Sequence, residues 1–417
     1  MSLLADLLST VFERRLMPWA AVPGDGRTLR EMCADLLDRT GEVTGQSTAR
    51  QILDLHATLG DDQKLAFYRH LATDLGVDTG ALRAALDAYE AGQNRDSYGA
   101  LMAASEPPRQ ELIRRLNRAP GGTGALVKMR ADLLRLGRKD PELSALDLDF
   151  QHLFASWFNR GFLVLRPISW ESPAHILEKI IQYEAVHAID SWEDLRRRLE
   201  PGDRRCFAFF HPAMPDEPLI FVEVALTRKV PGSVQALLAE DRAPMAAPEA
   251  DTAVFYSISN CQAGLAGISF GNSLIKQVAA DLARELPGLT TFVTLSPIPG
   301  LMRWMRDQGL AAEAEVEDDM AMRRLAARYL TEAKRDDGLP LDPVARFHLG
   351  NGAQVHQVHA RADLSKNGQA QSGGVMVNYL YALPRIAQNH ERFVTTHAVA
   401  ASSEIRTLSK AADLTPA

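Results

Sequence analysis

The sequence predicts an all-helical N-terminal domain over residues 1–157, followed by a mixed α/β domain over residues 158–417. In the first part, apolar residues recur at three- and four-residue spacing, which is the period of amphipathic helices. From Phe158 onward, apolar strand-like runs alternate with helical patterns, which is typical of α/β and α+β domains. A chain of 417 residues is long enough for two or three domains.

Three long stretches carry the helical period of the first part, and the pattern breaks at Gly, Pro and Asp-rich points. They are residues 49–76, 79–92 and 125–159. We find no convincing strand pattern among them, and they hold few groups suited to catalysis. We therefore expect this part to serve packing or self-association, as helical bundles commonly do.

In the second part the pattern predicts strands and helices in turn. The expected strands cover residues 161–169, 204–226 (two strands joined by a Pro/Asp turn), 252–259, 290–296, 352–364 and 372–383. The expected helices cover residues 269–286, 300–309 and 385–394. Residues 409–417 carry no periodic pattern, and we expect a loose tail there.

Composition excludes several classes of partner. The formal net charge of −7, with no Lys/Arg cluster, argues against nucleic acid. No apolar run approaches the ~18 residues that span a bilayer, and the N-terminus lacks the pattern of a signal peptide. Three widely separated cysteines, Cys33, Cys206 and Cys261, indicate reduced thiols in a cytoplasm rather than disulfides or a zinc site.

The stretch TLSPIPGLMRW, residues 294–304, places a lone hydroxyl, Ser296, at a strand-to-helix corner. Serine is a preferred N-cap residue and proline is common at the first helical position, so Ser296 could simply cap the next helix. It could equally be a nucleophile or a donor to a substrate. The motif is not G-x-S-x-G, so a hydrolase nucleophile elbow is not supported.

A glycine-rich loop, residues 259–276, lies between an expected strand and an expected helix. Gly264, Gly267 and Gly271 have the wrong spacing for the dinucleotide fingerprint, and no GK[ST] follows. Glycines in this position still let the backbone approach a ligand, and the N–H groups of the next helix favour an anion such as a diphosphate. The alternative is that they only permit a tight turn and close packing.

His348 precedes a turn formed by Gly350, Asn351 and Gly352, so we expect it at the rim of a loop. A histidine there could act as an acid or base near neutral pH, or be an ordinary surface or packed residue. His356 and His359 are three apart in an expected strand and should point to opposite faces, which argues against a shared metal site.

Two tyrosines, Tyr379 and Tyr381, fall on one face of the last expected strand by alternation. Such pairs are more often packing than chemistry. A phenol hydroxyl that lines a pocket would nevertheless be a competent donor.

Taken together, these stretches resemble the malonyl-CoA decarboxylase family. The resemblance covers residues ~160–385 nearly continuously and in the family's order, and the most specific part is LSPIPG together with FHLxNGA. The stretches that carry it are YEAVHAI (183–189), RRCFAFFHP (204–212), EPLIFVEVALT (217–227), VFYSIS (254–259), GLAGISFGNSLIK (264–276), TLSPIPGLMRW (294–304), RFHLGNGA (346–353) and MVNYLY (376–381).

The resemblance implies a helical oligomerisation domain over residues 1–157 and a catalytic domain of acetyltransferase-like (GNAT-like) fold over residues 158–417. It implies conversion of malonyl-CoA to acetyl-CoA and CO2 without a metal or an organic cofactor, in a homotetramer built as a dimer of dimers. The C-terminus lacks the peroxisomal S-K-L address of animal members. We therefore expect a bacterial, cytoplasmic enzyme.

The residue roles also follow from the resemblance. The catalytic residues it implies are Ser296, His348 and Tyr381. The malonyl-CoA-binding residues it implies are Ala266, Gly267, Ile268, Ser269, Phe270, Gly271 and Asn272, together with Ser296 and His348. Two positions depart from the family pattern, namely Ser269, where members carry a glutamate, and Glu223, where the animal enzyme carries a histidine.

Decarboxylation of a malonyl thioester needs donors at the thioester oxygen and an acid for the carbanion, and the thioester itself is the electron sink. A Ser/His/Tyr set suits these needs. The strongest rival is an acyl-CoA-dependent N-acetyltransferase on the same fold, since a fold does not fix a function. Another rival is a non-catalytic, acyl-CoA-sensing scaffold, which would tolerate loss of Ser296 and His348.

Overall fold

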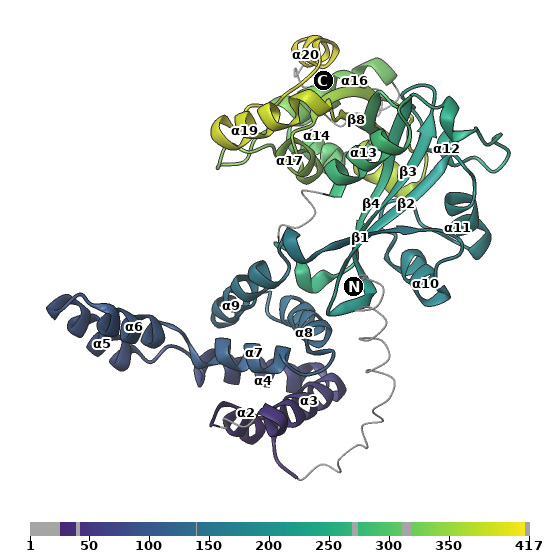
Figure 1. Cartoon of the computed structure of the whole chain (residues 1–417). Coiled ribbons are helices and arrows are strands. Elements are labelled where there is room, and N and C mark those ends of the chain that lie inside the picture. Colours follow the sequence, from purple (N-terminus) through teal and green to yellow (C-terminus); the bar gives the residue numbers. More distant parts are fainter. Residues whose placement is uncertain (1–25, 39–41, 139, 269–273, 311–317, 413–417) are drawn as a thin grey trace. The chain divides into compact units, whose positions relative to one another are not determined.

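The computed structural model of the chain describes residues 26–38, 42–138, 140–268, 274–310 and 318–412. Their contacts divide into two compact units (Figure 1). The first holds the described residues up to Gly122 together with Pro141–Leu146, and the second holds Thr123–Asp140 and the described residues from Asp147 onward. The predicted domain boundary after residue 157 stays a prediction.

The first unit is helical, as the sequence predicts. Its helices are α2 (Leu29–Asp38), α3 (Glu42–Thr58), α4 (Asp61–Thr73), α5 (Thr79–Ala91), α6 (Arg95–Ser105), α7 (Pro108–Asn117) and the start of α9 (Pro141–Trp157). Helix α4 buries Phe67, Tyr68 and Leu71. Tyr68 Oη lies 3.0 Å from Nε2 of the buried His56 on α3, so the polar atoms of this core are paired.

Helices α5 and α6 differ from the rest because no residue of either is buried, and every residue of both is described. The two helices contact each other through Tyr89 and Tyr98, whose ring centroids are 6.1 Å apart. Leu86, Tyr98 and Met102 remain 43%, 53% and 51% exposed. The hairpin therefore presents apolar side chains that its own unit does not cover.

The second unit combines helices with a sheet. Its helices are α8 (Gly122–Leu136), the remainder of α9, α10 (Ala174–Tyr183), α11 (Trp192–Leu199), α12 (Val234–Leu238), α13 (Leu274–Glu285), α14 (Leu301–Asp307), α16 (Asp319–Glu332), α17 (Pro343–Gly350), α18 (Lys366–Ser372), α19 (Ile386–Thr396) and α20 (Ser403–Lys410). Short 3₁₀ turns are η1 (Arg160–Phe162), η2 (Ala247–Glu249), η3 (Ala263–Leu265) and η5 (Leu383–Arg385).

The described strands of the second unit form one mixed sheet of eight strands. They are β1 (Val164–Ile168), β2 (Arg204–His211), β3 (Met214–Thr227), β4 (Thr252–Asn260), β5 (Thr291–Thr294), β6 (Ser296–Pro297), β7 (Gln354–His359) and β8 (Met376–Leu380). Strands β1 to β4 run antiparallel in sequence order, β4 pairs with β5 in parallel, and β8 pairs antiparallel with β5, β6 and β7. The predicted order, a helical region followed by a domain with a mixed sheet, is confirmed.

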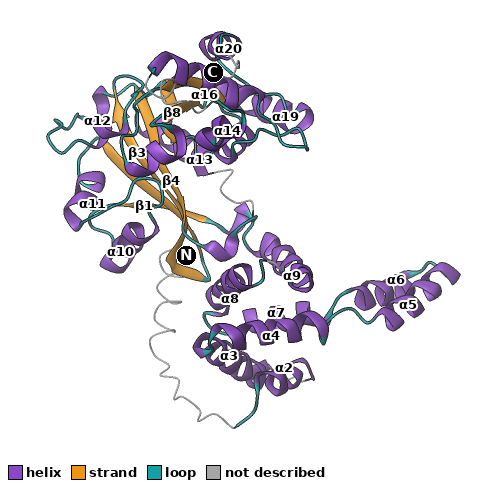
Figure 2. Ribbon diagram, turned by 180° about the vertical axis from the view of Figure 1, so that it is seen from behind, coloured by secondary structure: helices purple, strands orange, loops and turns teal. Residues whose placement is uncertain are grey.

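Helices cover both faces of this sheet (Figure 2). On one face, α10 and α11 bury an apolar cluster against β2 and β3 that includes Ile180, Leu195, Ala208 and Phe221. The crossover helix between the parallel strands β4 and β5 is α13, which buries five apolar side chains. This crossover carries the chain from the glycine-rich loop to the strand that leads to Ser296.

The structure differs from the sequence prediction in several details, and helices α10, α11, α12, α16, α17, α18 and α20 were not predicted. The β2–β3 turn lies at Pro212 and Ala213, and the Pro/Asp segment that follows belongs to β3. A helix that we did not predict, α20, follows α19, with Ser402 as its N-cap and Ile405 buried. The predicted loose tail therefore begins inside a helix, and residues 413–417 lie outside the described residues. No helix in the described ranges is long and apolar enough to cross a bilayer.

A buried carboxyl group interrupts the apolar packing under α10 and α11. Glu223 on β3 is fully buried, and its Oε2 lies 3.4 Å from the Arg198 guanidinium. Burial, with a further contribution from the nearby Glu184 carboxylate, raises the pKa of Glu223 to about 8. The folded protein therefore keeps a proton on this side chain at neutral pH.

We predict that Glu223 makes stability fall as pH rises. Between its ordinary pKa of 4.5 and about 8, the folded state binds this proton and the unfolded state does not, so unfolding is favoured as pH increases through that window. Glu223→Gln keeps the shape of the side chain but replaces the carboxyl with an amide that does not titrate. Its melting temperature, measured from pH 5 to pH 9, should decline less with rising pH than that of the wild type.

The control is Glu178→Gln, because Glu178 lies exposed on α10. This variant should follow the wild-type curve. Parallel curves for Glu223→Gln and the wild type would contradict the assignment.

Candidate active site

Ser296 lies where the chain passes from β5 to β6. The Leu295 N–H still donates to the Phe255 carbonyl of β4 at 3.0 Å, whereas Ser296 is already paired with Val377 of β8. The chain therefore leaves β4 at this point and continues against β8. Ser296 is 6% exposed, so its hydroxyl lies inside the domain.

Ser296 does not cap the following helix, so the first of the three interpretations of this corner is wrong. The N-cap of α14 is Gly300, and it makes no side-chain capping bond. A Cβ at Gly300 would lie 2.1 Å from the Tyr329 hydroxyl, so only glycine fits there. The glycine of the SPIPG motif thus allows the turn to pack against α16.

The Ser296 hydroxyl has two side-chain partners. Its Oγ donates to Thr294 Oγ1 at 2.8 Å and lies 3.2 Å from His348 Nε2. Thr294 is fully buried, and its Oγ1 also accepts the Tyr379 N–H at 3.1 Å. The serine side chain is therefore held between a strand neighbour and a histidine 52 residues further along the chain.

His348 is not at a loop rim, contrary to our prediction from the glycines that follow it. It lies within α17, is 2% exposed, and its carbonyl accepts the N–H of Asn351. The Gly-Asn-Gly segment marks the end of this short helix rather than a free turn. At the other end, buried Asp342 caps α17 by accepting the Ala345 N–H at 2.8 Å.

Tyr379 on β8 and Tyr381 just after it both contact the imidazole of His348, which agrees with their predicted common face. His348 Nδ1 lies 2.8 Å from the Tyr381 hydroxyl. The Tyr379 ring stacks on the imidazole, with centroids 4.5 Å apart and an interplanar angle of 24°. The Tyr379 Oη is buried and has no hydrogen-bond partner among the described residues. Ser296, His348 and Tyr381 thus form one hydrogen-bonded chain from three separate elements.

Burial determines the protonation states of His348 and Tyr381 in this hydrogen-bonded chain. Desolvation lowers the pKa of His348 to about 3 and raises the pKa of Tyr381 well above its usual value, so both are neutral at physiological pH. Since Ser296 donates to Thr294, it accepts from Nε2–H, and Nδ1 accepts the proton of Tyr381. The chain runs from Tyr381 through His348 and Ser296 to Thr294.

Two residues at the site escaped the sequence prediction. Thr294 carries a signal that could have revealed it, because it stands two residues before Ser296 in a strand-like run and so shares its face. Asp342 also carries one, since Asp followed by Pro is a strong helix-start pattern. Neither residue has an obvious role in the chemistry. Thr294 instead holds the Ser296 hydroxyl, and Asp342 caps the helix that carries His348.

The structure describes only part of the expected malonyl-CoA loop. Ala266, Gly267 and Ile268 follow the 3₁₀ turn η3, and Gly267 has a φ of +80°. The predicted residues Ser269, Phe270, Gly271 and Asn272 lie outside the described residues. The loop precedes α13, so it stands at the opposite end of the crossover from Ser296.

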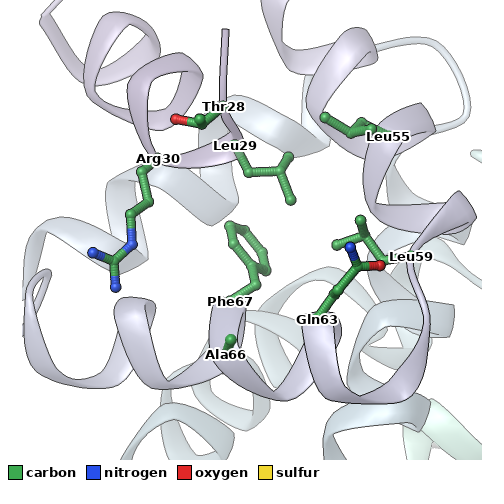
Figure 3. Close-up of a pocket in the computed structure, with 8 residues that line it drawn as sticks. All are labelled: Thr28, Leu29, Arg30, Leu55, Leu59, Gln63, Ala66 and Phe67. Atoms are coloured by element: carbon green, nitrogen blue, oxygen red, sulfur yellow. The ribbon is translucent and has the colours of Figure 1, made fainter.

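No predicted site residue lines the open pocket drawn in Figure 3, which lies in the first unit. Its lining is mainly apolar and consists of Thr28, Leu29, Arg30, Leu55, Leu59, Gln63, Ala66 and Phe67. The prediction that His356 and His359 point to opposite faces assumed regular alternation along the strand. A register shift between Val355 and Gln357 interrupts this alternation in β7, so the prediction loses its basis. No group of three or more potential metal ligands is found among the described residues.

Comparison with known protein families gives two matches that together cover most of the chain. A model described as the malonyl-CoA decarboxylase N-terminal domain matches residues 75–158. A model described as the malonyl-CoA decarboxylase C-terminal domain matches residues 161–321 and 311–415.

Individual relatives agree with the family models. Mitochondrial malonyl-CoA decarboxylase of Anser anser anser is 34% identical, over 80% of this chain and 77% of the relative. A crystal structure of malonyl-CoA decarboxylase from Rhodopseudomonas palustris has 50% identity and a TM-score of 0.85, and the match covers 91% of this chain and 98% of that chain. The Agrobacterium vitis structure has 48% identity and a TM-score of 0.87, covering 91% and 99%.

We predict that the His348 imidazole of the unliganded protein stays neutral between pH 5 and pH 8, with its proton on Nε2. The physical reason is burial, which lowers its pKa to about 3. Long-range ¹H–¹⁵N correlation spectra of ¹⁵N-histidine-labelled protein measure this directly. The His348 signals are assigned as those missing from His348→Asn, and signals that titrate near pH 6.5 would contradict the prediction.

Proposed function

The chain belongs to the malonyl-CoA decarboxylase family, a family of carboxy-lyases, and on that premise we propose that it converts malonyl-CoA to acetyl-CoA and CO2 with Ser296, His348 and Tyr381. The observation that carries the proposal is the buried hydrogen-bonded chain of these three side chains. They come from the SPIPG, FHLxNGA and NYxY motifs, which lie up to 85 positions apart in the sequence, 296 to 381.

The reaction breaks the bond between the malonyl α-carbon and its free carboxylate. The electron pair moves into the thioester to form an enolate, CO2 departs, and a proton then adds to the α-carbon. The protein must therefore stabilise negative charge at the thioester oxygen and deliver one proton. Because the thioester accepts the electron pair, the proposal includes no metal and no organic cofactor.

Ser296 is proposed to donate to the developing enolate oxygen. In the unliganded protein its hydroxyl donates to Thr294 Oγ1, a neutral acceptor that a charged substrate oxygen can replace. The buried setting strengthens such a bond, because no water competes for the oxyanion. An acyl-serine intermediate is not required by this scheme.

His348 is proposed to deliver the proton. A malonyl carboxylate close to the imidazole favours the charged form, so binding raises its pKa from the low value of the unliganded site. The imidazolium formed with a proton from solvent then protonates the α-carbon through Nε2 and returns to neutral. Tyr381 holds Nδ1 and keeps Nε2 directed at Ser296 and the substrate.

The coenzyme A part of the substrate is proposed to bind the loop from Ala266 to Asn272. Rotating the malonyl carboxylate out of the thioester plane is unfavourable, and remote binding energy from a large handle can offset that cost. A glycine-containing loop ahead of a helix favours the diphosphate of such a handle. This chain has Ser269 in the loop, and residues 266–272 include no Asp or Glu, so the proposal assigns no role to a carboxylate there.

The helical region is proposed to mediate assembly into a tetramer, as a dimer of dimers. The exposed apolar side chains of the α5–α6 hairpin support this proposal, since a second copy could cover Leu86, Tyr98 and Met102.

We predict that the purified protein releases CO2 from malonyl-CoA and forms acetyl-CoA with no amine acceptor present. Product is measured by chromatography of the CoA esters and by ¹⁴CO2 release from carboxyl-labelled substrate. Added EDTA should leave the rate unchanged. Acetyl transfer to an amine without decarboxylation would instead support the acetyltransferase alternative, and no turnover of malonyl-CoA would refute the proposed function.

We predict that Ser296→Ala and His348→Asn each lower kcat by about 10²-fold or more, because each removes a donor that acts in the transition state. Thr294→Val should have a smaller effect, since Thr294 holds the serine hydroxyl and the Tyr379 N–H and is assigned no contact with the substrate. A matched control is Ser372→Ala, because Ser372 is also a buried serine but bonds the Gly368 and Val375 carbonyls on α18 and after it. Near-normal turnover in either main variant would remove that residue from the mechanism.

A further inference from the structure

Arg130, in the middle of α8, is a buried cation with an unusual set of partners. Its side chain is 1% exposed, and a buried guanidinium is costly unless its donors find acceptors. Nε donates to Asp147 Oδ1 on α9 at 2.7 Å, and Nη2 lies 3.5 Å from Asp147 Oδ2. Nη1 donates to two backbone carbonyls, those of Gly264 at 2.7 Å and Ala266 at 2.9 Å.

Both carbonyls follow β4: that of Ala266 begins the proposed coenzyme A loop, and that of Gly264 lies in the 3₁₀ turn η3 just before it. The contact joins residues 134 and 136 positions apart, so no local pattern produces it. The loop also presses directly on α8, because a Cβ at Gly264 would lie 1.8 Å from the Val127 carbonyl oxygen. Glycine at position 264 therefore serves close packing on the helix, and Arg130 fixes the backbone that follows.

The guanidinium sets the direction of the next peptide groups. In a trans peptide the N–H points opposite to the carbonyl. With the Ala266 carbonyl turned toward Arg130, the N–H of Gly267 points away from the guanidinium, whereas the N–H of Ile268 donates to the Leu265 carbonyl at 3.0 Å. Gly267 itself has a φ of +80°, a conformation that favours glycine.

The ion pair indicates that Arg130 acts by position and not by attracting phosphate charge. Asp147 is 18% exposed and forms the partner of the guanidinium, and Gln151 Nε2 braces Asp147 Oδ2 at 2.5 Å from one turn along α9. The charge of Arg130 is thus balanced inside the protein. Helices α8 and α9, which lie side by side in Figures 1 and 2, form a platform for the loop.

We propose that Arg130, held by Asp147, is the positioning residue that orients the Gly264–Ile268 backbone to receive the nucleotide diphosphate end of malonyl-CoA. This rests on the proposed function and deepens it. The helical pair α8–α9 then does more than pack, because it sets the affinity for the coenzyme A handle. Ser296 and His348 lie on other elements, so Arg130 is not hydrogen-bonded to the groups proposed to act at the malonyl end.

The test compares two substrates in Arg130→Met. Malonyl-CoA carries the nucleotide diphosphate, whereas malonyl-pantetheine keeps the thioester and lacks it. We expect the KM for malonyl-CoA to rise by about 10-fold or more, the amount typical for losing charged hydrogen bonds, with any fall in kcat confined to this substrate. The KM for malonyl-pantetheine should stay at the wild-type value, a selectivity that general damage to the fold would not produce.

Two further variants complete the test. Arg135→Met, on the same helix, removes a guanidinium that is 52% exposed and paired with Asp132, and it should change neither KM. Arg130→Lys keeps the charge but lacks the fork that reaches Asp147 and both carbonyls, so it should raise the KM for malonyl-CoA alone. If Arg130→Met melts below the assay temperature, Arg130→Lys decides the question.

Unchanged KM values in the folded variants, or equal losses on both substrates, would overturn the assignment. Failure of the proposed function gives a different result, because the wild-type protein itself would then not decarboxylate malonyl-CoA. In that case calorimetric titration with CoA still tests whether Arg130 positions the loop. Weaker binding to the variant than to the wild type supports the positioning role, and equal or undetectable binding to both refutes it.

Discussion

The candidate site depends on one buried group, the imidazole of His348 held between Ser296 and Tyr381. A neutral imidazole survives in this interior because both ring nitrogens have partners and the ring stacks on Tyr379. The neighbouring features serve this placement. Asp342 caps the helix that carries His348, and Thr294 holds the Ser296 hydroxyl, to which His348 Nε2 is hydrogen-bonded. The strength of the site comes from exclusion of water, which makes each hydrogen bond count for more than it would at a surface.

Much of the second unit could be predicted from local sequence because its strands alternate and its turns contain Gly and Pro. His348 shows where such reasoning fails. A Gly-Asn-Gly segment after a histidine signals a turn, but the same residues also end a helix, and the deciding signal lay upstream in Asp342 and Pro343. Ser296 shows the converse. Its cap-like context was real, yet the cap position fell four residues later at Gly300, because β6 pairing kept the chain extended.

Other features had no local signal at all. Arg130 appears in the sequence as one more basic residue of an amphipathic helix, and only tertiary structure shows that it lies against the Gly264 and Ala266 carbonyls. Glu223 likewise occupies a strand whose neighbours are apolar, and its burial becomes interpretable only through Arg198. Buried polar groups of this kind depend on partners far along the chain, so a pattern of periods and turns cannot assign them.

The β4–α13–β5 crossover links the two ends of the proposed site. The loop that contacts Arg130 precedes α13, and Ser296 lies just beyond β5. Helix α13 buries Leu274, Ile275, Val278, Ala279 and Leu282, so it is fixed along its length. Interactions of the coenzyme A handle can assist a strained malonyl geometry only if the connection between them does not yield. The packing of α13 supplies that stiffness over Leu274–Glu285, the part of the crossover that leads to β5 and Ser296.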